Sequence, residues 1–196
     1  MIIHPALALL EFGSIAAGIV AGDAMVKRAR LDLIKAGTVQ PGKYLVLIGG
    51  QVADVEEAIE AARQAEASTL VDIVFLPDVH PDVVAAVAGA RRSGEGEALG
   101  IIETTTVAAI IQAADAGVKG AQVALREVRM ADGLGGKGYL LFGGAVADVE
   151  AAVAIGSARV PGELVRETVI AQLHQEMVEN LATDGRFKRL VRSEEE

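Results

Sequence analysis

The stretch Ala98–Lys119 reads ALGIIETTTVAAIIQAADAGVK, and a related sequence, ALALLEFGSIAAGIVAGDAMVK, occupies Ala6–Lys27, 92 positions earlier. A second related pair follows at an offset of 94, with LIGGQVADVE at Leu47–Glu56 and LFGGAVADVE at Leu141–Glu150. A period of about 90 residues is too long for the stacked repeats of a solenoid and fits two fused globular domains. The chain is therefore interpreted as one domain written twice.

The repeat divides the chain into four parts. The first domain is expected over residues 1–90 and the second over residues 98–184, with a linker at 91–97 and a tail at 185–196. The linker lies in the polar, glycine-rich sequence GARRSGEGE, which has no apolar period. The tail is basic and then acidic, and we expect it to be exposed to solvent.

Apolar periodicity predicts the same order of elements in both domains, β-α-β-β-α-β and a terminal helix. The expected strands are Ala6–Phe12, Leu31–Ala36, Lys43–Ile48 and Leu70–Leu76, then Ala98–Thr104, Val123–Met130, Lys137–Phe142 and Leu164–Ile170. The expected helices are Ile15–Lys27, one beginning near Val52 and one within Pro77–Val87, then Val107–Lys119, Val146–Ala158 and Leu173–Leu181. This order is typical of an α/β fold, an α+β sandwich of two tandem split-βαβ (ferredoxin-like) domains with antiparallel or mixed sheets.

Two local features are predicted from the same pattern. In the first helix, Ile15, Ile19 and Val26 share a face and are expected to point toward the core. The glycine pairs Gly49-Gly50 and Gly143-Gly144 are expected to be tight turns, because the acidic helix starts that follow them would repel a phosphate.

The composition indicates a chain that completes its burial by association. Hydrophobic residues make up 52% of the chain but aromatic residues only 3%, and there are 22 glycines. Small side chains give thin cores, so we expect the chain to bury further surface against other chains. The net charge of −9 argues against binding to nucleic acid or to an anionic membrane through charge.

The apolar N-terminus resembles a signal peptide or an anchor, because His4 and Glu11 are the only ionisable side chains between Ile2 and Gly22. However, no basic residue precedes the apolar run, and the same pattern recurs inside the chain at 98–119. The segment is therefore expected to form a buried strand and a helix, with no membrane as partner.

No group of residues indicates catalysis. Glu11 and Glu103 each end the first strand of their own copy, so a structural role such as bonding backbone at an interface is favoured over acid–base chemistry. His80 and His174 follow the last strand of each copy, at spacings that suit no metal site. The chain has no cysteine and hence no thiolate ligand. We therefore expect no enzyme activity, no catalytic residue, no metal and no cofactor.

The motifs ALGIIET and AADAGVK in the second copy, LALLEF and AGDAMVK in the first, and GG-x-VADVE in both resemble the bacterial microcompartment shell-protein family. Two unpermuted copies in one chain are similar to the tandem-domain members, which form homotrimers with the outline of a hexamer. The resemblance implies a structural shell protein in the bacterial cytoplasm. Its partners would be further copies of itself, other shell proteins and the enzymes that the shell encloses.

The resemblance also implies a central pore for small polar metabolites, surrounded by the loop between the second and third strands. In the first copy this loop corresponds to Thr38, Val39, Gln40, Pro41 and Gly42. In the second copy it corresponds to Ala131–Gly136, including Asp132, Gly133, Leu134, Gly135 and Gly136, and this loop is expected to be peripheral or mobile.

Two further implications concern metal binding and the edges at which neighbouring trimers, the tiles of the shell, meet. In the family, the lysine that ends the first long helix lies where neighbouring tiles meet, which maps to Lys27 and Lys119, with Asp23 and Asp115 at i,i+4 spacing. The loops are most similar to a tandem shell protein of propanediol utilisation whose pore holds an iron–sulfur cluster on a cysteine. Gln40 stands in the place of that cysteine, so thiolate ligation of a cluster is not available.

Two other functions are compatible with the sequence. A tandem ligand-sensing protein of split-βαβ type would bind an amino acid or a nucleotide between the copies and would be a monomer or dimer. A small cytosolic enzyme would depend on a particular polar residue, for which the sequence offers no candidate.

Overall fold

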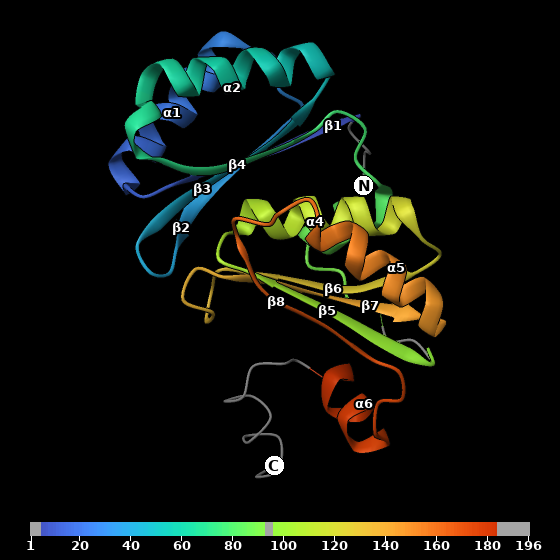
Figure 1. Ribbon diagram of the computed structural model, residues 1–196. Helices are drawn as coiled ribbons and strands as arrows, with labels where there is room; N and C mark the ends of the chain where they lie inside the picture. Colours follow the sequence, from blue (N-terminus) through green and yellow to red (C-terminus); the bar gives the residue numbers. More distant parts are fainter. Residues whose placement is uncertain (1–4, 93–95, 184–196) are drawn as a thin grey trace.

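The computed structural model describes residues 5–92 and 96–183, which form two similar halves (Figure 1). The halves correspond to the two copies of the sequence repeat and are called copy one and copy two. Each contains a four-stranded sheet with two long helices on one face. The expected tail at 185–196 and the middle of the expected linker lie outside the described residues.

The order of elements is the same in both copies. Copy one consists of β1 (Ala6–Phe12), α1 (Ile15–Arg28), β2 (Leu33–Val39), β3 (Lys43–Gly50), α2 (Val52–Glu66), the 3-10 helix η1 (Ala67–Thr69), β4 (Leu70–Leu76) and α3 (Pro81–Val87). Copy two consists of β5 (Ala98–Thr104), α4 (Val107–Gly120), β6 (Ala124–Met130), β7 (Gly138–Gly144), α5 (Val146–Ser157), β8 (Leu164–Ile170) and α6 (Gln175–Ala182). Ser14 and Thr106 begin the first long helices, because their hydroxyl oxygens accept hydrogen bonds from backbone N–H groups three residues later.

Both sheets have the same topology. The strand order is β2-β3-β1-β4 in copy one and β6-β7-β5-β8 in copy two, and the described strand pairs are antiparallel. The first strand of each copy lies between two neighbours. Its central place explains its continuous apolar sequence, because all residues of β1 are buried.

Helices and sheets alternate along the molecule (Figure 1). The helices α1 and α2 cover one face of the copy-one sheet, α4 and α5 cover one face of the copy-two sheet, and α4 lies between the two sheets. One apolar core lies beneath α1 and α2 and includes Phe12 and Met25. A second core joins the copies, because Leu7 and Leu9 on the other face of β1 belong to the same cluster as Ile111 of α4. The packing of copy one on copy two is therefore hydrophobic.

Four of the eight strands, β2, β3, β6 and β7, have bounds that differ from expectation. The second strand covers Leu33–Val39, whereas apolar alternation predicts Leu31–Ala36. The glycine pairs are not turns but the last residues of β3 and β7, since Gly50 pairs with Ala6 and the equivalent pairing recurs in copy two. Pairing with the central strand thus outweighs the local preference of glycine for turns.

The apolar face of α1 is a further correction. Ile15, Ile19 and Val26 are expected to point toward the core, but they are 41%, 53% and 47% exposed. The buried side of α1 consists mainly of small residues, and a Cβ added at Gly18 would lie 2.5 Å from the Tyr44 ring. The close approach of helix and sheet therefore selects small residues for the core side and leaves the large apolar side chains outside.

Candidate functional site

Polar contacts join copy one to copy two at the N-terminus of α4. Glu11 at the end of β1 is fully buried, and its Oε2 accepts a hydrogen bond from the backbone N–H of Val107 at 2.9 Å. Its Oε1 accepts a hydrogen bond from Lys43 Nζ at 2.6 Å. The carboxylate thus favourably meets the positive end of the α4 dipole and is balanced by Lys43. Glu11 has the structural role at an interface that its position in the repeat predicts.

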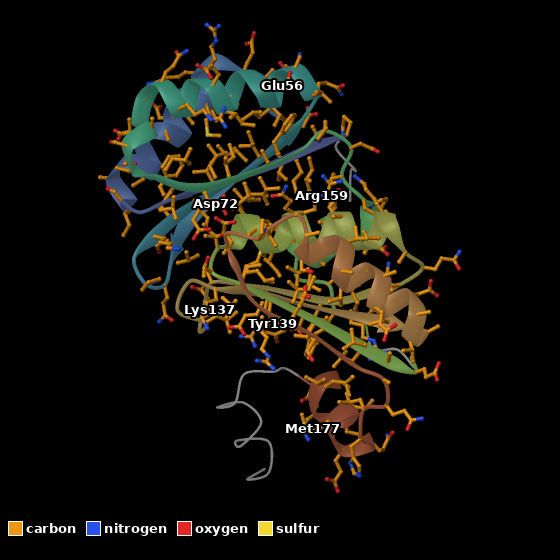
Figure 2. All side chains as sticks on the ribbon, in the orientation of Figure 1. Glu56, Asp72, Lys137, Tyr139, Arg159 and Met177 are labelled. Atoms are coloured by element: carbon orange, nitrogen blue, oxygen red, sulfur yellow. The ribbon has the colours of Figure 1, made fainter. Side chains whose placement is uncertain are left out.

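Asp72 of β4 adds a second contact at the same end of α4. The Thr106 hydroxyl caps α4 and donates a short hydrogen bond to Asp72 Oδ2. Figure 2 shows Asp72 at the side of the copy-one sheet that faces copy two. Because Glu11 and Asp72 lie on adjacent strands, together they fix the position of the helix end against the sheet.

Asp115 makes the third contact, from the second half of α4. Its Oδ1 accepts a hydrogen bond from the backbone N–H of His80 at 2.9 Å, and its Oδ2 pairs with Lys119 Nζ at 2.7 Å. Lys119 also donates a hydrogen bond to the carbonyl oxygen of Asp78. The Asp115–Lys119 pair therefore holds the junction between the copies, with the Asp115 side chain almost fully buried.

The equivalent pair of copy one, Asp23 and Lys27, has no such partners among the described residues. The two side chains lie 2.5 Å apart and are both more than half exposed. Two identical pairs therefore stand in different surroundings. Copy one covers the face of α4 that points away from the copy-two sheet. The equivalent outer face of α1 is not covered by any part of the chain that the structure describes.

The apolar faces of α1 and α4 differ in the same way. Val107 and Ile111 of α4 are fully buried in the core that joins the copies. Their counterparts 92 positions earlier, Ile15 and Ile19, are exposed. The exposed face of α1 thus has the composition of a helix face that is buried elsewhere in the same molecule. Within the described residues, no helix has the length and apolar character needed to cross a membrane.

His80 and His174 act as helix caps. The Nδ1 atoms of the two rings accept hydrogen bonds from the backbone N–H groups of Asp82 and Glu176, at 3.1 and 3.4 Å, where α3 and α6 begin. Their repeated position therefore has a structural cause. In residues 5–92 and 96–183, no three histidine, aspartate or glutamate side chains are grouped so that they could hold a metal ion.

The two loops assigned to the pore contact each other. In copy one, β2 and the turn that follows it contain the candidates Thr38, Val39, Gln40, Pro41 and Gly42. The backbone N–H of Gln40 donates to Asp132 Oδ1 at 3.3 Å, and the backbone N–H of Gly133 donates to Gln40 Oε1 at 3.2 Å. The copy-two loop therefore lies directly against the copy-one turn.

The copy-two loop is also closed by hydrogen bonds of its own. The N–H of Ala131 donates to the carbonyl oxygen of Lys137 at 2.8 Å, and the N–H of Leu134 donates to the carbonyl oxygen of Ala131 at 2.9 Å. Gly135 and Gly136 have positive φ, which explains the glycine content of the loop. A Cβ at Gly136 would lie 2.9 Å from the Pro41 ring, so glycine is also needed for the contact between the loops.

These loops do not fit an iron–sulfur cluster. Protein-bound clusters depend mainly on cysteine thiolates, and the chain contains no cysteine. The side-chain oxygen of Gln40 is instead bonded to the N–H of Gly133. Lys43, next to the turn, is bound to Glu11. The turn therefore offers neutral polar groups rather than metal ligands.

Sequence reasoning does not find three residues of the junction, which are Lys43, Asp72 and Thr106. Thr106 could have been recognised, because threonine directly before an apolar helix is a common N-cap. Lys43 and Asp72 give no such signal, since their partners lie 32 and 34 positions away in the sequence.

Known proteins have sequences similar to that of this chain. The sequence profile of the BMC domain matches residues 6–79 and again residues 98–173. The chain is 42% identical over 174 residues to the bacterial microcompartment shell protein PduT of Citrobacter freundii, a match that covers 88% of this chain and 95% of that protein. It is 35% identical over 69 residues to the carboxysome shell protein CcmK3 of Synechococcus elongatus, covering 33% of this chain and 68% of that protein.

Solved structures share the fold. A crystal structure of a microcompartment protein from Desulfitobacterium hafniense matches with a TM-score of 0.77 and 43% identity, covering 89% of this chain and 98% of that chain. The fused permuted hexameric shell protein MSM0275 from the RMM microcompartment matches with a TM-score of 0.57 and 20% identity, covering 78% of this chain and 82% of that chain. At this identity the match shows that the fold is similar and nothing more. The chain therefore belongs to the BMC domain family, with two BMC domains in tandem. The expected family and the expected α/β fold are confirmed.

Proposed function

We propose that the chain is a structural, non-enzymatic shell protein of a bacterial microcompartment, with domains at residues 1–90 and 98–184, and that three chains close into a pseudohexamer. The shell role is the one named for PduT of Citrobacter freundii, whose sequence matches nearly the whole chain. The observation that carries the ring is the exposed apolar face of α1, whose counterpart on α4 is buried by copy one. A head-to-tail contact that repeats around an axis closes into a ring when its rotation divides a circle.

The contact within one chain predicts the contact between chains. Glu103, the counterpart of Glu11, pairs with Lys137 at 2.7 Å and is still 36% exposed. We expect its carboxylate to accept a hydrogen bond from the backbone N–H of Ile15 on the next chain. This bond would repeat the one between Glu11 and Val107, because Ile15 begins α1 as Val107 begins α4.

The copy-one acid–lysine pair has predicted partners of the same kind. Asp23 is expected to accept a hydrogen bond from the backbone N–H of His174 on the neighbouring chain. Lys27 is expected to donate to the carbonyl oxygen of Gln172 on that chain. These are the sequence counterparts of the contacts that Asp115 and Lys119 make with copy one.

One position differs between the contact within the chain and the predicted contact between chains. Asp72 lies opposite Glu11 in the copy-one sheet, and Arg166 lies opposite Glu103 in the copy-two sheet. A guanidinium would therefore face Ser14 of the next chain, where a carboxylate faces Thr106 within the chain. A hydroxyl both donates and accepts, so the contact is kept with the direction of the hydrogen bond reversed.

A ring of this kind brings the loops around its axis, where the Gln40 turn and the Asp132–Gly136 loop would alternate. The hydrogen bonds between Gln40 and the copy-two loop support a rim built from both, which revises the expectation that the second loop is peripheral. Thr38–Gly42 remains the proposed lining. Its neutral polar groups suit the passage of small polar metabolites and do not themselves select a sign of charge, whereas Asp132 adds a carboxylate to the rim.

Lys27 and Lys119 remain the proposed tile-edge residues, with Asp23 and Asp115 as the ion-pair partners that hold them in place. Lys119 is still 38% exposed although it is bonded within the chain, so it can reach a neighbouring tile of this protein or of another shell protein. The tiles would lie in a shell within the bacterial cytoplasm and enclose enzymes.

Electron microscopy of the purified protein tests the proposal. Flat tiles or sheets built from threefold particles are expected. The ligand-sensing alternative predicts single chains or dimers that bind an amino acid or a nucleotide saturably, and that result would replace the shell role.

A further inference from the structure

The helix α6 lies beneath the copy-two sheet, on the face that α4 and α5 do not cover (Figure 1). Its Val178 and Leu181 are turned toward that sheet, because they line a cavity together with Leu99 and Leu141 of the strands. No residue of α6 is buried, and Met177, labelled in Figure 2, is 49% exposed. The Met177 side of α6 is therefore open to solvent in the part of the chain that the structure describes.

The counterpart of α6 in copy one is α3, since both helices begin after a capping histidine at an offset of 94. Val83 stands in the place of Met177 and is fully buried. It belongs to the same apolar cluster as Leu125 of β6, and α3 contacts both α4 and β6. Copy two therefore covers the side of α3 that is open in α6.

The strand β2 lacks the cover that α3 gives to β6. Ile34 of β2 pairs with Ile48. Leu125 of β6 pairs with Phe142, 94 positions further along the chain, so Ile34 and Leu125 are counterparts. Leu125 is 2% exposed, whereas Ile34 is 38% exposed. The surface that α3 occupies at β6 is therefore open at β2.

A second copy of the chain can bring the two open surfaces together. Within one chain the copy-two sheet lies between α6 and β2, so α6 does not cover its own β2 (Figure 1). In the proposed ring, α1 of the next chain lies against Leu99, as α4 lies against the counterpart Leu7. Because α1 contacts β2 of its own copy, β2 of that next chain borders α6. The open side of α6 is thus continuous with the proposed interface.

The charges at the two surfaces are complementary. Lys35 follows Ile34 in β2 and is exposed. The helix α6 carries Glu176 and Glu179, which are also exposed. In residues 5–92 and 96–183, none of these three charged side chains forms an ion pair. Opposite charges on two docking surfaces favour one partner and one register.

We propose that α6 of each chain docks on β2 of the next chain, with Met177 against Ile34 and with the glutamates of α6 beside Lys35. The contact repeats the one between α3 and β6. This inference rests on the proposed ring and extends its interface to a second surface. Both α3 and α6 lie outside the residues that match the BMC domain, 6–79 and 98–173, so the contact is made by helices beyond that domain.

Crosslinking of the full-length chain tests the contact. The chain has no cysteine, so Ile34→Cys and Met177→Cys together introduce two thiols. A short bis-maleimide should then join two and three chains on denaturing gels, because the thiol on α6 meets the thiol on β2 of the next chain. Each single variant should give no such product. Val71→Cys with Met177→Cys is the matched control, since Val71 lies in β4, at the opposite edge of the copy-one sheet.

The strength of the contact can be measured by light scattering over a dilution series. Met177→Ala should raise the concentration at which half of the chains are assembled by about fivefold, because the methionine loses its contact with Ile34. Val71→Ala should leave that concentration unchanged, because Val71 is 48% exposed although copy two is packed on the same sheet.

Light scattering also separates this inference from the ring. A wild-type mass of one chain would overturn both. A trimer in which the Ile34→Cys and Met177→Cys thiols give no product, or only a product within one chain, would overturn the docking of α6 and leave the ring standing. An equal effect of Met177→Ala and Val71→Ala on the assembly of a trimer would have the same meaning.

Discussion

Glu11 and Val107 stand 96 positions apart in the sequence, yet the Glu11 carboxylate accepts a hydrogen bond from the backbone N–H of Val107 at 2.9 Å. The bond is buried and charge-assisted, and it ties the first strand of one BMC domain to the first helix of the other. Glu103, the counterpart of Glu11, is bonded to Lys137 alone among the described residues. The free half of this carboxylate is therefore where we expect a second chain.

Replacing the two glutamates should separate folding from assembly. Glu11→Ala leaves a partly buried Lys43 ammonium and the buried Val107 N–H without their partner, and should lower the free energy of unfolding by about 3 kcal/mol. Glu103→Ala should change the stability of the chain much less, because its side chain is partly exposed, but it should raise the protein concentration needed for assembly. Thermal denaturation and light scattering over a dilution series measure the two effects. If both variants lowered the melting temperature equally, the assignment of Glu11 to folding and of Glu103 to assembly would be wrong.

The exposed face of α1 predicts an assembly defect without a folding defect. Ile19→Glu places a charge where we expect contact with the next chain, and should abolish the trimer at micromolar concentration. Because Ile19 is 53% exposed in the single chain, the substitution should cost that chain less than about 0.5 kcal/mol. Val52→Glu is the matched control, since Val52 is also exposed and begins α2, where an acid is favourable. If the Ile19→Glu variant still forms trimers, α1 is not part of the interface between chains.

Lys27 and Lys119 should matter for sheets more than for trimers. The double variant Lys27→Ala and Lys119→Ala removes two ion pairs, each worth about 0–1 kcal/mol, and the hydrogen bonds that these lysines make or are expected to make across the junctions between BMC domains. The trimer should nevertheless persist, because the apolar face of α1 and the Glu103 carboxylate are unchanged. Sheets seen by electron microscopy should become fewer or smaller, because both side chains are candidates for contacts between tiles. Sheets of normal extent from the double variant would show that these lysines serve only the junctions between BMC domains.

The proposed place of Gln40 at the pore can be tested by crosslinking. The chain has no cysteine, so Gln40→Cys introduces a single thiol. If three such turns surround one axis, a short bis-maleimide should join two chains, and denaturing gels should show a crosslinked dimer. Arg63→Cys, on the exposed side of α2, should give none. If crosslinking is equally poor for both variants, the Gln40 turns do not surround the threefold axis.

The repeat predicts most of the fold because it reports the same element order twice. The strands Ala6–Phe12 and Ala98–Thr104 have the predicted bounds, since a buried central strand is a continuous apolar run with clear ends. The orientation of α1 is not predictable in this way. Apolar periodicity shows that Ile15 and Ile19 share a face, but it does not show whether that face meets the core of the same chain or another chain.

The contacts of the site are less accessible from sequence than the elements. Asp115 and Lys119 are correctly paired by their i,i+4 spacing, but their bonds to His80 and Asp78 depend on how the copies pack. Arg126, the inserted residue of a bulge in β6, is missed for a different reason. A one-residue bulge leaves the strand pattern of β6 recognisable, and the inserted residue is found only when the cross-strand register is known.

The mass of the assembly in solution is the most direct test that the contact between the copies is repeated between chains. Light scattering or native mass spectrometry of the wild-type protein should give about 61 kDa, three times the 20.2 kDa of one chain. The value should hold on dilution to low micromolar concentration, because the predicted interface buries the same apolar helix face that copy one buries on α4. A stable mass of one or two chains under these conditions would contradict the ring.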